Sequence, residues 1–206
     1  MRPALHLPPA PQGLTQLGTE EKFERLAFEG QSFEGQAADL VSFLGCRLTR
    51  VGLANTRLPK VDFTDSTLDA CDLANAAWEK AHLGGVRLEG CRMVGLDLSR
   101  AYLKGCALEG CNASFAQFRD AGLREARFKD CNLRGASFQG ADLKGASFAG
   151  CDLGECQMSF ARLAGADFRG AELKGLRIRI EDLKGLIVDP AQAAYLAGLM
   201  GLRILA

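Results

Sequence analysis

Large apolar side chains recur at every fifth residue of this chain, from Phe23 to Leu183. Of the 33 positions in this series, 31 hold Leu, Phe, Met, Ile or Trp, and only Ala38 and Ala113 interrupt it. An amphipathic helix repeats its apolar residues about every 3.6 positions and a half-buried strand about every two, so neither element explains a period of five. A short fixed period indicates a solenoid, in which each unit buries its apolar face by stacking on its neighbours.

The residues around each apolar centre repeat as well. Two places before the centre the chain is small, usually Ala, and all eight cysteines occupy this register: Cys46, Cys71, Cys91, Cys106, Cys111, Cys131, Cys151 and Cys156. The intervening residue is often Asp or Asn, and Gly frequently closes the unit. These residue types suit corners of the chain. Asp and Asn side chains accept hydrogen bonds from the backbone of a turn, and Gly tolerates a positive φ.

Runs such as CNLRG-ASFQG-ADLKG-ASFAG-CDLGE, from Cys131 to Glu155, resemble the unit of the pentapeptide-repeat family, Ala/Cys-Asp/Asn-Leu/Phe-x-x. The resemblance covers about 160 of the 206 residues. It implies an all-β solenoid, namely a right-handed quadrilateral β-helix of about eight coils with four pentapeptides per coil. Residues twenty apart would then stack at ~4.8 Å, which gives a rod roughly 40 Å long.

Three segments are predicted along the chain. Residues 1–20 hold four of the six prolines and form a loose leader or a cap, residues 21–187 form the β-helix, and residues 188–206 form a C-terminal cap. Asp189 followed by Pro190 is a good helix start, with Asp as N-cap and Pro at the first helical position, and the helix would run to Met200. Such a segment can cover the last coil or join two copies, and the two roles are compatible. The resemblance implies a homodimer through Tyr195, Leu196, Leu199, Met200, Leu202 and Ile204.

No catalytic, cofactor or metal site is predicted. The chain has only two histidines and no Cys-x-x-Cys pair, so the usual zinc spacing is missing. Five cysteines twenty apart, from Cys71 to Cys151, would stack in one column; a disulfide stack, a metal wire and a redox sensor are alternatives, but small core residues explain them more simply. No apolar run is long enough to span a membrane, and inward thiols suit a reducing compartment, so we expect a cytoplasmic protein without membrane contact.

Outward charges follow a pattern that the balance of 25 basic and 25 acidic residues hides. Where the position after a centre is charged, it is acidic in the first half of the chain and, apart from Glu109, basic in the second, for example in the column Lys104, Arg124, Lys144 and Lys184. Such a column could bind phosphates. The next position carries the opposite sign, however, which predicts mutual pairing on a solvated face. Because no aromatic residues interleave with the charges, we expect no direct binding of nucleic acid.

Two sites disturb the repeat. Around Ala38 and around Ala113 the sequence offers a second frame, shifted by two residues. A local bulge at each site would bring Leu40 or Phe115 inward. The alternative is that Phe115, together with Phe160 at another outward position, forms an exposed contact patch.

The segment Ile180-Glu181-Asp182-Leu183-Lys184-Gly185-Leu186, followed by a helix, resembles the ending of the quinolone-resistance (Qnr-type) branch of the family. This resemblance implies a non-enzymatic rod that protects DNA gyrase or topoisomerase IV by mimicking DNA. Zero net charge and the absence of projecting loops depart from that branch. An interaction scaffold with an unknown partner is therefore the alternative. The acidic column predicted to bind the partner comprises Glu29, Asp69, Glu89 and Glu109.

Overall fold

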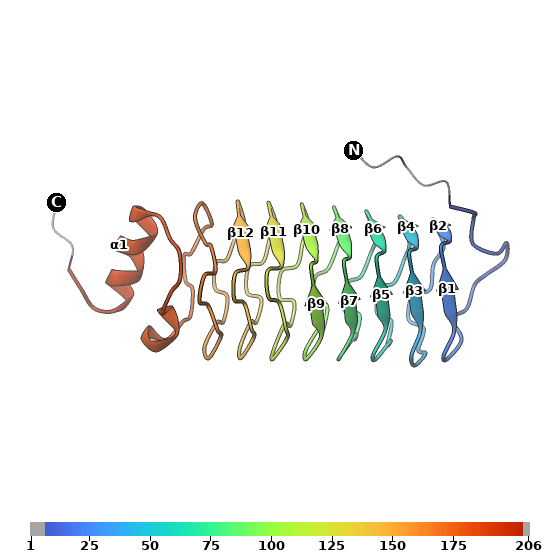
Figure 1. Ribbon diagram of the computed structural model, residues 1–206, viewed down its shortest axis with the longest axis horizontal. Helices are drawn as coiled ribbons and strands as arrows, with labels where there is room; N and C mark the ends of the chain where they lie inside the picture. Colours follow the sequence, from blue (N-terminus) through green and yellow to red (C-terminus); the bar gives the residue numbers. More distant parts are fainter. Residues whose placement is uncertain (1–6, 204–206) are drawn as a thin grey trace.

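The computed structural model describes residues 7–203 and shows a straight rod of short parallel strands stacked along its long axis (Figure 1). One sheet has five strands in the order β1-β3-β5-β7-β9, and a second has seven in the order β12-β11-β10-β8-β6-β4-β2. The strands of the first sheet are β1 (Lys22–Glu24), β3 (Ser42–Leu44), β5 (Asp62–Thr64), β7 (His82–Gly84) and β9 (Tyr102–Lys104). Those of the second are β2 (Ala27–Glu29), β4 (Arg47–Thr49), β6 (Thr67–Asp69), β8 (Arg87–Glu89), β10 (Ala107–Glu109), β11 (Arg127–Lys129) and β12 (Ser147–Ala149).

Each strand pairs in parallel with the segment twenty residues further along the chain. Phe23 lies opposite Phe43, and Leu68 lies opposite Leu88. Isolated bridges with the same spacing complete the other two sides of each coil, and the column that begins at Ala27 continues to Ile187. Twenty residues per coil and one inward centre every five residues give four sides per coil. The predicted β-solenoid of pentapeptide units is therefore confirmed.

The interior is filled by the two inward side chains of every unit. The large centres are almost completely buried, and the Ala or Cys residues two positions earlier occupy the slim layers between them. Aromatic centres stack along the rod axis: the rings of Phe118 and Phe138 are 4.8 Å apart and nearly parallel. Trp78, the largest core residue, donates from Nε1 to the hydroxyl of Thr56, which replaces Ala at a small inward position. This polar pair satisfies the indole N–H inside an otherwise apolar core.

Two local features turn the chain at each corner. The Asp or Asn before a centre accepts a hydrogen bond from the backbone N–H two residues later, as Asp152 does from Gly154 at 2.7 Å. The last residue of most units has a positive φ, for example 57° at Asn55 and 69° at Gly135. Gly adopts this left-handed conformation without a steric penalty, and Asn tolerates it. This conformation explains why Gly so often closes the unit.

The bulges predicted at Ala38 and Ala113 do not occur. Both alanines occupy inward centre positions and are buried. Leu40 and Phe115 occupy the positive-φ corners that follow, each with φ 59°, and point outward with exposed fractions of 45% and 60%. Phe160 lies at an equivalent corner, is 59% exposed and packs under the Arg179 guanidinium. An apolar residue at a corner is thus exposed because the backbone turn fixes its direction.

Both ends of the rod are covered. At the N-terminal end, Ala10 and Leu17 are buried against the first coil, and Ala10 N–H donates to the carbonyl of Ala27. At the other end, the 3₁₀ helix η1 (Ile180–Leu183) leads into α1 (Pro190–Leu199), which lies across the last coil (Figure 1). Asp189 and Gln192 form a reciprocal capping box at the start of α1, so the predicted helix and its N-cap are confirmed. No helix within residues 7–203 has the length and apolar character of a membrane span.

All eight thiols are reduced and buried. Four members of the Cys71–Cys151 column donate to main-chain carbonyls 23 residues earlier, as Cys71 Sγ does to Leu48 at 3.4 Å. Burial raises the pKa of Cys106 to about 11 and that of Cys156 to about 12. These surroundings fit small core residues, and Cys106 and Cys156 remain protonated thiols at neutral pH.

The buried thiols predict a loss of stability at high pH. Since the pKa of Cys106 and Cys156 is higher in the folded chain than the ordinary 9.0, the unfolded chain loses these protons first. The stabilisation is complete below about pH 9 and declines as pH rises from 9 towards 11–12, by up to about 1.4 kcal/mol per pH unit for each thiol. Urea unfolding at a series of pH values measures it. A Cys106→Ala/Cys156→Ala variant should lose less stability over this range, and an equally steep decline in that variant would refute the assignment.

Candidate functional site

The predicted acidic column lies on the outward face of the seven-stranded sheet. We call the four residues Glu29, Asp69, Glu89 and Glu109 the acidic column. Each ends a three-residue strand and follows the inward centre, so its side chain must point out of the rod. Asp69 lies directly opposite Glu89, and Glu89 lies opposite Glu109. The structure thus brings three of the four carboxylates together on neighbouring strands.

Glu29 stands apart from the other three. Thr49 lies between it and Asp69 in the register of the sheet. Beyond Glu109 the column continues as Lys129, whose pKa is raised by the Glu109 carboxylate that it contacts. The acidic run is therefore bounded by a hydroxyl at one end and an ammonium at the other.

Most members of the acidic column form ion pairs. Glu29 pairs with Arg50 at 2.7 Å, Glu109 pairs with Lys129, and Glu89 lies 3.7 Å from Arg87. No ion pair involving Asp69 occurs in residues 7–203. Exposed pairs of this kind are worth roughly 0–1 kcal/mol each, so they can exchange for contacts with another molecule at little cost.

The pairing predicted between consecutive outward positions is largely replaced by pairing between coils. Arg50 reaches Glu29, and Lys129 reaches Glu109, across about twenty residues of sequence. Other pairs join residues two apart on one side of a coil, such as Arg169 and Asp167. Between an outward residue and its immediate successor, only the 3.9 Å approach of Lys129 to Asp130 is found within the described chain. Mutual neutralisation is therefore present, but by a different geometry.

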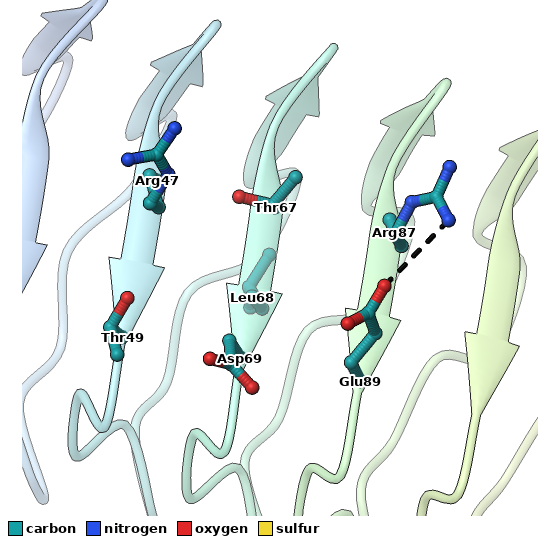
Figure 2. A pocket seen from close by; sticks show the side chains of 7 residues that line it. All are labelled: Arg47, Thr49, Thr67, Leu68, Asp69, Arg87 and Glu89. Atoms are coloured by element: carbon teal, nitrogen blue, oxygen red, sulfur yellow. Dashed lines mark ion pairs between the residues drawn. The ribbon is translucent and has the colours of Figure 1, made fainter. Parts of the chain in front are cut away.

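A shallow furrow of about 200 Å³ lies beside the acidic column. It forms because Thr67 is short, whereas Arg47 and Arg87, its neighbours in register, are long (Figure 2). Asp69 and Glu89 line one side, and Figure 2 shows Glu89 turned towards Arg87. Its remaining wall residues are Thr49 and Leu68. Both signs of charge meet here, so the furrow can receive polar or charged groups of another molecule.

Apart from Leu68, the side chains that line the furrow are acids, arginines and threonines. Its walls contain no His, Cys or Ser, and the residues from 7 to 203 contain no cluster of three His, Cys, Asp or Glu side chains placed to hold a metal. His82 lies on the other sheet, at the start of β7. The arrangement provides contact chemistry, namely ion pairs and hydrogen bonds.

The residues predicted to join two copies divide into two groups. Leu196 is buried in the cap, and the hydroxyl of half-buried Tyr195 accepts a hydrogen bond from Gly175 N–H at 2.8 Å, so these two hold α1 on the rod. Leu199, Met200 and Leu202 remain 51%, 44% and 60% exposed. Ile204 lies outside the described residues. Only the second group is open to contact with another molecule.

Sequence reasoning did not identify the furrow or the basic residues that line it. Arg47, Thr67 and Arg87 occupy the outward position before each centre, whereas the prediction followed the position after it. Counting both outward positions in steps of twenty would have revealed a short residue between two long ones.

Parallel strands in twenty-residue register, a core of one large and one small residue per unit, and corners at positive φ define a pentapeptide β-solenoid. Residues 81–158 match the family model described as "Pentapeptide repeat region". Over these residues the chain is similar to the pentapeptide-repeat family. No curated protein matches the sequence.

Two solved structures are similar to this chain. A trypsin-treated form of QnrB1, a plasmid-mediated fluoroquinolone resistance protein, is 21% identical over 93% of this chain and 99% of that chain, with a TM-score of 0.52. HetL, a pentapeptide repeat protein involved in heterocyst differentiation regulation from the cyanobacterium Nostoc sp. strain PCC 7120, is 22% identical over 85% of this chain and 90% of that chain, with a TM-score of 0.48. At 21% identity the likeness to QnrB1 concerns the fold alone.

Proposed function

We propose that this protein is a non-enzymatic rod that binds DNA gyrase or topoisomerase IV through its acidic column. The observation that carries the proposal is the in-register line of Asp69, Glu89 and Glu109. Neighbouring strands place these carboxylates ~4.8 Å apart, somewhat wider than the ~3.4 Å between phosphates of one DNA strand along the helix axis. A basic surface that binds DNA phosphates would meet a comparable row of negative charges.

The dimensions of the rod support the same proposal. The column from Ala27 to Ile187 makes eight steps of twenty residues. At ~4.8 Å per step the rod is roughly 38 Å long, close to the ~34–36 Å of one turn of duplex DNA. The fold is similar to that of QnrB1, a fluoroquinolone resistance protein, and a type II topoisomerase is therefore the partner to test first.

Zero net charge limits the mechanism to local contacts. The 25 basic and 25 acidic residues cancel, so the whole rod does not attract a basic partner from a distance. Binding would instead depend on a few carboxylates, with Arg50, Arg87 and Lys129 released from their pairs when a partner replaces them. We place the protein in the cytoplasm, where a topoisomerase is reached and buried thiols stay reduced.

The test is DNA supercoiling by purified gyrase in the presence of a fluoroquinolone. Wild-type protein should relieve the inhibition, or itself inhibit supercoiling at excess. An Asp69→Lys/Glu89→Lys variant should lose the effect because the row of negative charge is reversed. Glu79→Lys, an exposed substitution on another side of the rod, serves as the matched control and should retain it. No effect of the wild type over a wide titration contradicts the proposal.

We also propose that two rods join through the exposed side chains of Leu199, Met200 and Leu202. Three neighbouring apolar residues at the end of a cap favour contact with a second copy. Sedimentation of the wild type should give a dimer, and Leu199→Asp should shift it to monomer. A wild-type monomer at high concentration rules this out.

A scaffold for another protein partner is the second candidate. It is favoured by the exposed rings of Phe115 and Phe160, because aromatic side chains are enriched at protein interfaces. A pull-down from host lysate, followed by Phe115→Ala and Phe160→Ala variants, tests it. Failure of the wild-type protein to enrich any stable partner counts against this candidate.

A further inference from the structure

The side of the rod that carries the five-stranded sheet becomes positively charged towards its C-terminal half. Lys104 ends β9, and Arg124, Lys144 and Arg162 follow on the next coils of the same side. We call these four residues the cationic face. All four side chains are exposed, and neither Lys104 nor Lys144 forms an ion pair in residues 7–203.

The acidic residue within this face is withdrawn from the surface. Asp142 has a side chain only 14% exposed, and it lies 2.6 Å from Arg124 and 3.9 Å from Arg162. The guanidinium side chains of both arginines, 59% and 62% exposed, extend further into solvent than the carboxylate. Exposed acids next to the face lie at the adjoining corners, Asp120 on one edge and Glu125 on the other. The face itself therefore presents cations to an approaching molecule.

An aromatic stack borders the cationic face on its N-terminal side. His82 and Tyr102 lie in register on β7 and β9, with ring centroids 5.8 Å apart and an interplanar angle of 13°. Tyr102 is 48% exposed and leans over Gly122, where an added Cβ would lie 2.9 Å from the ring. Because Gly122 has no side chain, nothing from that position of the next coil stands above the Tyr102 ring.

Two features of this face differ from the sequence-based expectation that the chain does not bind nucleic acid. In the part of the chain that the structure describes, no cation of this face forms an ion pair with the residue that follows it in the sequence. In addition, Tyr102 of the aromatic stack lies on the same strand as Lys104, two residues earlier. The sequence shows the column of Lys104, Arg124 and Lys144, but the stack of His82 on Tyr102 becomes visible only in the structure.

We infer that this side of the rod binds a short stretch of single-stranded nucleic acid, with a base stacked on Tyr102 and phosphates bound by Lys104, Arg124 and Lys144. Aromatic platforms beside a basic track are what sequence-independent single-strand binders use. A duplex buries its bases and offers no free π-face to Tyr102. From Lys104 to Arg162 the face spans three coils, roughly 14 Å, which suits a few nucleotides. Asp62, on the far side of His82, would repel phosphates and sets the other limit of the site.

The inference is independent of the proposed topoisomerase function, since it concerns another side of the rod and requires no enzyme. The experiment is fluorescence anisotropy of a labelled oligothymidine titrated with the purified full chain at several salt concentrations. Affinity should fall with salt at a slope of about −0.7 per phosphate contact, and Lys104→Ala or Lys144→Ala should each reduce that slope by about 0.7. Lys174→Ala, at an exposed position on the opposite side of the rod, is the matched control and should leave it unchanged.

Two substitutions of Tyr102 test the stacking of a base on its ring. Tyr102→Ala should weaken oligothymidine binding about tenfold, whereas Tyr102→Phe should bind as the wild type does. A circular dichroism spectrum and a melting curve identical to those of the wild type exclude misfolding, which an exposed position should not cause. Absence of binding at low salt overturns the inference. So does binding of a duplex with equal affinity and no response to Tyr102→Ala, which would mark a surface for polyanions in general.

Discussion

Replacement of Phe148 by Ala is expected to lower the free energy of unfolding by about 3–5 kcal/mol. The ring is fully buried and lies between two other rings of its column, 4.8 Å from Phe128 and 5.0 Å from Phe168. It also makes an edge-to-face contact with Phe138 from the opposite side of the coil. Coils above and below are fixed by their own hydrogen bonds, so they cannot collapse into the space, and most of the cavity should persist. Urea unfolding followed by circular dichroism measures the difference.

The chain offers a matched control with the same chemical change. Phe115→Ala removes an identical ring from a corner where it is 60% exposed. Both Phe and Ala require the same left-handed φ of 59° there, so the backbone strain does not change. We expect a difference within about 0.5 kcal/mol of the wild type. Equal losses at positions 115 and 148 would mean that the inward and outward registers are assigned incorrectly.

The contrast between these two phenylalanines explains how far the sequence could be interpreted. The period of five places Phe148 inside without any knowledge of coordinates. Phe115 is equally apolar, and a rule that places apolar residues inside predicted a bulge for it. The structure instead keeps Ala113 at the centre and leaves Phe115 on the corner. Keeping the five-residue register is worth more here than burying the Phe115 ring, because moving one unit out of register would break hydrogen bonds to the coils on both sides.

The fixed repeat also explains why the sequence predicted the line of carboxylates in the candidate site but not its side-chain contacts. Steps of twenty were sufficient to place Asp69, Glu89 and Glu109 in one line, since each is fixed to its strand by the neighbouring inward centre. They could not give the side-chain pairing, because long arginines such as Arg50 and Arg87 choose among partners on their own coil and on the next. The depth of the furrow at Thr67 likewise depends on the length of its neighbours along the rod.

Removal of one complete coil, residues 122–141, is expected to leave a folded rod. The new junction joins Ala121 to Asp142 and keeps both the five-residue and the twenty-residue phase, so Leu103 would stack on Leu143. In a solenoid each unit contacts only its neighbours, and stability is close to a sum over units and their interfaces. At about 0.05–0.15 kcal/mol per residue, twenty residues account for about 1–3 kcal/mol. A shortened protein with an unchanged circular dichroism spectrum and a modestly lower melting temperature is the expected result.

Removal of Gly140 alone should be far more damaging than removal of twenty residues. It moves every later residue back by one place, which turns Lys144 into a core centre and Leu143 outward. A buried unpaired ammonium costs several kcal/mol. The next units would lose their large apolar centres as well, because Ala149, Gly154 and Ser159 would take those positions. The coils after residue 140 should therefore fail to dock, leaving a C-terminal half that limited proteolysis digests while the N-terminal coils resist. If this variant melted as the wild type does, a local adjustment would be absorbing the missing residue, and the period of five would not determine the register of the rod.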